Sequence, residues 1–122
     1  MAKRILVVDD EEDIAANLRM RLQATGYEVM VASDGNTAYE MAKQESPDLI
    51  VLDLTLPGMD GYQVCRLLKF DDKYKHIPII MLTARTQAED KEWGEKVGAD
   101  CYMTKPYESK ELLAKVKELL GV

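Results

Sequence analysis

Three aspartates stand directly after short apolar runs of this sequence, where they could bind a metal ion or act as a base or a nucleophile. Asp9 and Asp10 follow residues 5–8, and Asp53 follows residues 49–52. Unbroken apolar runs of this length are typical of strands that are covered on both faces of a parallel sheet. In open α/β sheets, ligands bind at the carboxyl ends of the strands. The sequence therefore predicts that the three carboxylates share the ligand-binding edge of one sheet.

Two further strand ends supply a hydroxyl group and an ammonium group. Thr83 follows the apolar run at 78–82, and Lys105 comes shortly after a strand expected at 101–103. Carboxylates that are packed together cannot all stay ionised without a cation, and Mg²⁺ prefers such hard oxygen ligands. A hydroxyl and an ammonium opposite the metal would suit the remaining oxygens of a phosphoryl group. Each residue alone is a weak signal, but the five together indicate Mg²⁺-dependent phosphoryl chemistry.

The elements that must position these residues alternate regularly along the chain. We expect strands at 5–8, 28–32, 49–53, 78–82 and 101–103 and helices at 12–25, 36–45, after Asp60, at 86–97 and at 109–120. Strands that alternate with helices form parallel sheets covered on both faces. Right-handed crossovers favour the flavodoxin-like strand order 2-1-3-4-5. The prediction is one doubly wound (βα)5 domain of the α/β class over residues 1–122.

Helix starts are marked by two capping patterns. Asp60 with Gln63, and Thr86 with Glu89, each resemble a capping box, in which two side chains satisfy the first backbone N–H groups of a helix. The helix after Asp60 presents Val64, Leu67 and Leu68 as its apolar residues. The helix expected at 86–97, in contrast, carries very few large apolar residues. A narrow apolar stripe docks a helix weakly on a sheet, so we expect this helix to be the most mobile.

The overall composition excludes several other classes of function. A net charge of −6 over 122 residues argues against binding nucleic acid or an anionic membrane directly. No apolar run approaches the ~20 residues that span a bilayer. Cys65 and Cys101 have neither a metal-ligand spacing nor the pattern of a disulfide framework. We therefore expect a cytoplasmic protein with two reduced, buried cysteines.

Taken together, the motifs resemble those of the receiver domain of two-component response regulators, over essentially the whole chain. The matching segments are Val7-Val8-Asp9-Asp10, Asp53, Pro57-Gly58-Met59-Asp60-Gly61, Thr83-Ala84, Gly98-Ala99-Asp100 and Lys105-Pro106. Their order and spacing are highly specific as a set. The resemblance also implies a cis Lys105–Pro106 peptide bond, which proline permits.

The resemblance implies a role for each residue of the acidic edge. Asp53 would be the phosphoacceptor, attacking a phosphohistidine of a sensor histidine kinase or a phosphotransfer protein, or a small phosphodonor. Asp10, Asp53 and the backbone carbonyl of Thr55 would bind Mg²⁺ directly, and Asp9 would act through water. Lys105 would pair with Asp53 and then with a phosphoryl oxygen. Such a protein catalyses its own phosphorylation but is a signalling switch rather than an enzyme.

The switch itself also follows from the resemblance. Thr83 would turn its hydroxyl toward the phosphoryl group, and Tyr102 would move inward into the space that opens. This rearranges the face made by the helix at 86–97, the strand at 101–103 and the helix at 109–120. That face would contact a downstream output domain or protein, or a second copy in a phosphorylation-dependent homodimer. Tyr102 could instead be an ordinary strand aromatic.

Three other functions share features of this pattern. A pseudo-receiver uses the same fold as a constitutive binding module, but usually lacks one of the acidic residues or the lysine, which are all present here. A phosphatase with an aspartate nucleophile needs a second acid where Thr55 stands. A flavin-binding module needs a first loop rich in Gly, Ser or Thr, and here that loop is acidic. The receiver interpretation is favoured, with the pseudo-receiver as the main alternative.

Overall fold

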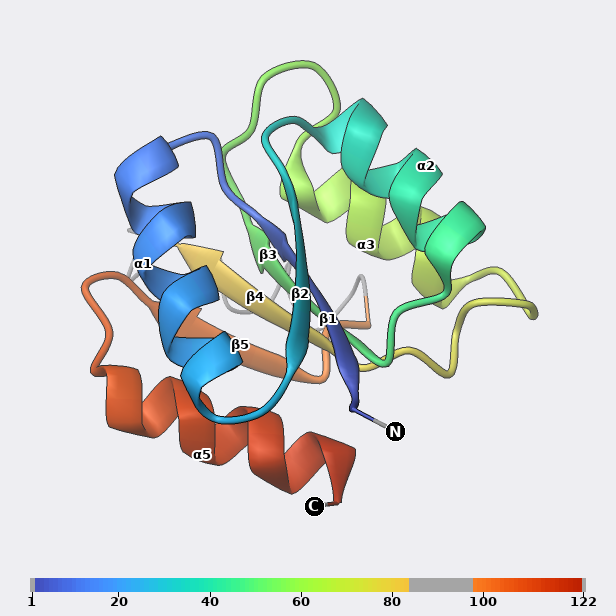
Figure 1. Ribbon diagram of the computed structural model, residues 1–122. Coiled ribbons are helices and arrows are strands. Elements are labelled where there is room, and N and C mark those ends of the chain that lie inside the picture. Colours follow the sequence, from blue (N-terminus) through green and yellow to red (C-terminus); the bar gives the residue numbers. More distant parts are fainter. Residues whose placement is uncertain (1, 84–97, 122) are drawn as a thin grey trace.

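The computed structural model of the protein describes residues 2–83 and 98–121, which form a five-stranded parallel sheet with helices on both faces (Figure 1). The strands are β1 (Arg4–Val8), β2 (Glu28–Ala32), β3 (Leu49–Asp53), β4 (Ile79–Thr83) and β5 (Cys101–Thr104). The described helices are α1 (Glu12–Ala24), α2 (Gly35–Glu45), α3 (Gly61–Lys69) and α5 (Ser109–Leu120). The strand order β2-β1-β3-β4-β5 confirms the predicted fold class.

Alternate residues of the strands feed two separate apolar clusters, one on each face of the sheet. On one face, α1 and α5 pack through Leu18, Leu22 and Leu112 against strand residues such as Ile5. On the other face, α2 and α3 pack through small and branched residues such as Ala42 against the intervening strand positions. Because β1, β3 and β4 are covered on both faces, nearly all of their residues are buried. This burial explains the continuous apolar runs of the sequence.

Strand β5 differs from its neighbours because it lies at the edge of the sheet. Within the described part of the chain it pairs with β4 alone, in the register Ile80↔Cys101 to Thr83↔Thr104. Its residues are half-buried or exposed, whereas every residue of β4 is buried. The position of β5 therefore depends on fewer contacts than that of any central strand.

The boundaries of the described helices and strands follow the predictions to within one residue. Asp60 and Gln63 form both hydrogen bonds of the predicted capping box at the start of α3. Helix α2 begins one residue earlier than predicted, because the Asp34 side chain accepts the Thr37 backbone N–H and acts as the N-cap. Helix α1 ends one residue earlier than predicted, and β4 lies one residue later. The helix expected at 86–97, with its capping box, lies outside the described residues.

Leu67 does not lie on the buried face of α3, although the sequence grouped it with Val64 and Leu68. Val64 and Leu68 are buried, whereas 43% of the Leu67 surface is exposed. The buried stripe of α3 consists of Gly61, Val64, Cys65 and Leu68, which recur at intervals of three and four residues. Leu67 falls outside the stripe that α3 turns toward the sheet.

Two glycines allow the loop after β3 to pack closely against its surroundings. A Cβ atom at Gly61 would lie 2.3 Å from the backbone oxygen of Asp53, and one at Gly35 would lie 1.7 Å from that of Met59. Any side chain at these positions would force the backbone apart. The loop that follows Asp53 is therefore packed closely against Gly61 near its start and against Gly35 at Met59.

Neither cysteine forms a disulfide, as predicted. Cys65 is buried in α3, and burial raises the pKa of its thiol to about 12. Cys101 is half-buried rather than buried, because it lies on the edge strand β5. Among the described residues, no helix combines the length and the apolar character needed to cross a membrane.

Candidate functional site

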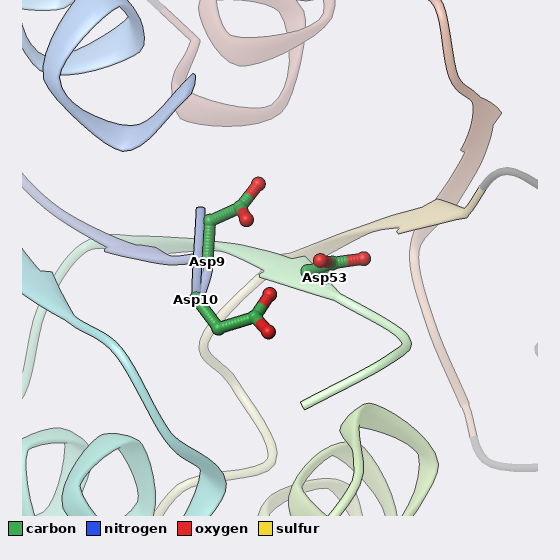
Figure 2. Close-up of side chains that lie close together, drawn as sticks. All are labelled: Asp9, Asp10 and Asp53. Carbon is green, nitrogen blue, oxygen red and sulfur yellow. The ribbon is translucent and has the colours of Figure 1, made fainter. Parts of the chain in front are cut away.

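The three predicted aspartates lie together at the carboxyl edge of the sheet. Figure 2 shows Asp9 and Asp10 side by side at the end of β1 and Asp53 opposite them at the end of β3. One carboxylate oxygen from each of the three residues lies within 4.8 Å of the others. Asp9 and Asp53 are buried, with 3% and 5% of their surface exposed, whereas Asp10 faces solvent. The predicted acidic cluster is thus present, and it is open to solvent on the Asp10 side.

The backbone fixes the two buried aspartates by continuing the hydrogen bonding of the sheet. The Asp9 backbone N–H donates to the Ala32 carbonyl at 3.1 Å. Each buried carboxylate also accepts a hydrogen bond from the backbone N–H two residues further on. The Glu11 N–H donates to Asp9 Oδ1 at 2.9 Å, and the Thr55 N–H donates to Asp53 Oδ1 at 3.4 Å. These local bonds hold the carboxylates toward the loops that follow the strands.

The Lys105 ammonium lies close to both buried carboxylates. Its Nζ atom lies 3.0 Å from Asp9 Oδ2 and 3.2 Å from Asp53 Oδ2. The Lys105 backbone N–H donates to the Thr83 carbonyl, which ties the end of β5 to the end of β4. The peptide bond that follows Lys105 is cis, as expected from the resemblance. Sequence reasoning missed a third neighbour, Glu11 Oε1 at 3.9 Å, although it directly continues the run of acids.

Burial and charge act in opposite directions at this site. Burial raises the pKa of Asp53; Lys105 lowers it and Asp9 raises it further, and the net shift is upward. For Lys105, burial alone would lower the pKa, but the hydrogen bond and charge of Asp9 and the charge of Asp53 outweigh it and raise the pKa. Lys105 is therefore firmly cationic, while Asp53 is a carboxylate whose charge is only partly compensated.

The charge balance of the cluster is suited to a divalent cation. Among the described residues, three clustered carboxylates face the ammonium of Lys105, and one lysine cannot neutralise all three. Carboxylate oxygens at this separation are hard ligands of the kind that Mg²⁺, Mn²⁺ or Ca²⁺ accepts. Burial is the main cause of the raised pKa of Asp53, and the neighbouring charge of Asp9 adds to it.

The three remaining predicted residues lie on β4, in the loop after β3 and on β5. Thr83 is 1% exposed at the end of β4, next to the strand that carries Asp53. Thr55 lies in the loop after β3, and its side chain is exposed. Tyr102 is half-buried on β5, where its ring packs against the cluster under α2 and α3. The Tyr102 hydroxyl is fully buried and makes no hydrogen bond in the described part of the protein.

Comparison with known families agrees with this fold and site. The sequence pattern of the response regulator receiver domain matches residues 5–117. That match covers β2 to β5 completely, β1 from its second residue, and the whole acidic cluster. The chain therefore belongs to the receiver domain family of two-component response regulators.

Individual relatives support the same assignment. The chain is 49% identical over 120 residues to the alkaline phosphatase synthesis transcriptional regulatory protein PhoP of Bacillus subtilis (strain 168). This match covers 98% of the chain but 49% of PhoP, so the chain spans about half the length of this relative.

Two solved structures have closely similar folds. The receiver domain of a signal transduction histidine kinase from Syntrophus aciditrophicus is 37% identical with a TM-score of 0.93, over 98% of this chain and 91% of that one. The receiver domain of sensor histidine kinase PA1611 from Pseudomonas aeruginosa is 30% identical with a TM-score of 0.91, over 100% of both chains. The PA1611 structure has a magnesium ion coordinated in its active site cleft.

Proposed function

We propose that this receiver domain accepts a phosphoryl group on Asp53 in a Mg²⁺-dependent reaction, with a phosphohistidine of a sensor histidine kinase or phosphotransfer protein as the donor. One observation carries the proposal: Asp53 is buried beside two further carboxylates, and its Oδ2 atom lies 3.2 Å from the Lys105 ammonium. A carboxylate is a weak nucleophile, so it needs fixed positive charge to stabilise the transferring group.

The residues of the cluster divide the work of this reaction. A carboxylate oxygen of Asp53 attacks phosphorus, the P–N bond to the donor histidine breaks, and the leaving imidazole takes up a proton. Lys105 holds Asp53 in position before transfer and then binds a phosphoryl oxygen, since its firmly cationic side chain reaches both buried carboxylates. The Thr83 hydroxyl, at the neighbouring strand end, donates to another phosphoryl oxygen.

Asp10, Asp53 and the backbone carbonyl of Thr55 would hold Mg²⁺ directly, and Asp9 would act through water. This assignment is supported by the solvent-facing position of Asp10 and by the ion pair that already engages Asp9 with Lys105. When bound, Mg²⁺ neutralises the clustered carboxylates and the incoming phosphoryl oxygens. The magnesium ion in the PA1611 receiver domain supports the choice of metal.

The change of state would pass from Thr83 to Tyr102 and the output face. The buried Tyr102 hydroxyl lacks a partner among the described residues, and an unpaired buried hydroxyl is costly. This cost favours a rearrangement that would give the hydroxyl a partner, and phosphorylation would bias such a change through Thr83. Of the output face that the resemblance implies, β5 and α5 belong to the described residues, whereas the segment 84–97 lies outside them. This face would bind an output domain, a downstream protein or a second phosphorylated copy.

The pseudo-receiver alternative is less well supported. A binding module needs no buried carboxylate whose charge is incompletely compensated, and that arrangement costs stability here. We further propose that the domain is a cytoplasmic signalling switch rather than an enzyme that turns over a substrate.

Beryllofluoride, which mimics a phosphoryl group on aspartate, gives a direct test of the site. Fluorine NMR of the wild-type protein with Mg²⁺ should show a bound, slowly exchanging signal, and chelation of Mg²⁺ should remove it. The matched control is Asp60→Asn, which alters the nearby cap of α3 and not the cluster. Asp53→Asn should bind nothing. A wild-type protein that binds Mg²⁺ and stays folded but gives no bound signal would favour the pseudo-receiver.

A further inference from the structure

A second group of charges lies at the opposite end of the sheet from the acidic cluster. Lys69, the last residue of α3, places its ammonium 2.6 Å from Asp100 Oδ2. The same ammonium donates to the backbone carbonyls of Lys75 at 3.1 Å and Ile77 at 2.7 Å. All three N–H groups of the ammonium thus have an acceptor. The Lys69 side chain is 10% exposed, so this is a nearly enclosed cation with a complete set of partners.

Asp100 connects this cation to the starts of two strands. The carboxylate oxygen that meets Lys69 also accepts the Ile79 backbone N–H at 2.8 Å. The Asp100 backbone N–H donates to the Ile79 carbonyl at 3.0 Å. Since Ile79 begins β4 and Asp100 directly precedes β5, the pair joins the end of α3 to the first residues of both strands. We call Lys69 and Asp100 the junction pair.

The backbone approaches the stem of Lys69 closely at the same place. Gly98 has φ +85°, and a Cβ atom there would lie 3.1 Å from Lys69 Cβ. A side chain at 98 would be strained by this φ and crowded by Lys69. The chain therefore enters β5 against the lysine, and both the charge and the stem of Lys69 define where β5 begins.

Strand β5 leads directly from the junction pair to the acidic cluster. It begins immediately after Asp100 and ends at Thr104, immediately before Lys105. An extended chain rises about 3.3 Å per residue, so the two sites are roughly 17 Å apart along one strand. Because β5 is a half-buried edge strand with a strand neighbour on one side among the described residues, its attachments at the two ends contribute to fixing its position.

We propose that Lys69 and Asp100 are positioning residues for phosphoryl transfer, because they fix the amino end of β5 and thereby hold Lys105 against Asp53 and Asp9. This inference rests on the proposed function of Asp53. Neither residue reaches the phosphoryl site, so the pair acts only through β5. Loss of the pair lets β5 shift along β4 and displaces the lysine ammonium from the buried carboxylates.

The substitution Lys69→Met tests this directly, since it keeps most of the stem against Gly98 and removes the charge. We expect phosphorylation of Asp53 by acetyl phosphate to slow about tenfold, because displacement of a positioned group by about 1 Å costs up to ~100-fold. Asp100→Asn keeps an acceptor for the Ile79 N–H and should slow the reaction less, which provides a milder variant if Lys69→Met is poorly folded. The matched control is Lys75→Met, which removes an exposed ion pair with Asp72 in the same region and should react at the wild-type rate.

Amide hydrogen exchange separates this proposal from the proposed function and from a purely structural role. In Lys69→Met, residue-resolved exchange at Cys101–Lys105 should become faster, including at the Lys105 N–H that bonds Thr83, whereas exchange in α1 should be unchanged. This readout does not need phosphorylation, so a wild-type protein that accepts no phosphoryl group would refute the function and leave the junction pair testable. A lower melting temperature with wild-type exchange in β5 and a wild-type reaction rate would overturn the inference.

Discussion

The Lys105 ammonium lies 3.2 Å from Asp53 Oδ2 although 52 residues separate the two positions in the chain. The contact exists because β4 lies between β3 and β5, so the ends of these strands meet at one edge of the sheet. The place of the Lys105 ammonium therefore depends on the position of β5. The ionisation of Asp53 depends on the charges that lie around the end of β3.

Replacing Asp53 by Asn should stabilise the protein at neutral pH in the absence of Mg²⁺. The pKa of Asp53 in the folded protein is raised above 3.8, so the fold favours the neutral carboxyl. The stability that this neutral form contributes is complete below the unfolded pKa and is lost as the pH rises through the folded pKa. An Asn side chain does not ionise and so does not lose this stability. The variant should therefore be more stable than wild type only at pH values above the folded pKa of Asp53.

Thermal denaturation of both proteins with a chelator present, below pH 3.8 and at neutral pH, measures this difference. A gain on the order of 1 kcal/mol corresponds to a rise of about 4 °C in melting temperature for a domain of this size. An equal difference between the two proteins at both pH values would argue against a raised Asp53 pKa.

Replacing Lys105 by Met should destabilise the protein by roughly 3 kcal/mol, because it leaves two buried carboxylates without their cation. Mg²⁺ should recover part of this loss, because a ligand that binds only the folded state stabilises it by RT ln(1 + [Mg²⁺]/Kd). Urea denaturation with and without Mg²⁺ gives both quantities. A loss that is the same in both conditions would mean that Lys105 and the metal do not balance the same charges.

Replacing Gly61 by Ala should cost roughly 1–3 kcal/mol and weaken Mg²⁺ binding. The new methyl group would lie 2.3 Å from the Asp53 backbone oxygen and 2.8 Å from Leu54 Cα, so the loop that carries Thr55 must move. Gly121→Ala is the control: its φ of +71° is unfavourable, by about 1 kcal/mol, but its Cβ would meet open space. Denaturation and calorimetric Mg²⁺ titration of both variants should separate them, and equal Mg²⁺ affinities would contradict the steric argument.

The two thiols should differ sharply in reactivity. Cys65 is fully buried with a pKa of about 12, so at mildly alkaline pH it should not react with a disulfide reagent until the protein unfolds. Cys101 is half-buried on β5 and should react first, although burial also raises the pKa of its thiol. Mass spectrometry of the labelled, digested protein identifies the site, and early labelling of Cys65 would show that α3 opens readily from the sheet.

The fold could be predicted because its central strands are buried on both faces, which leaves an unmistakable signature in runs such as residues 49–52. The edge strand β5 was harder, since its residues are half-buried, yet the crossover rules still placed it beside β4. Leu67 was assigned wrongly to the core because an apolar residue beside a buried stripe cannot be told from a member of it.

The gathering of the acidic cluster could be predicted, but not its internal arrangement. Asp9 and Asp10 are adjacent and chemically identical, and only the structure shows that Asp9 turns inward to Lys105 while Asp10 faces solvent. The contact between Lys69 and Asp100 could not be predicted at all, because each residue is individually a common surface charge. Such pairs depend on where a helix end and a strand start meet, which no local pattern records.

The most direct test of the central claim is the intact mass of the protein after incubation with Mg²⁺ and acetyl phosphate, with Asp53→Asn in parallel. The account predicts that the wild-type protein gains the mass of one phosphoryl group, that chelation of Mg²⁺ prevents the gain, and that the variant gains nothing. A gain of the same size in Asp53→Asn, or no gain in a folded wild-type protein that binds Mg²⁺ but does not bind beryllofluoride, would contradict the assignment of Asp53 as the phosphoacceptor.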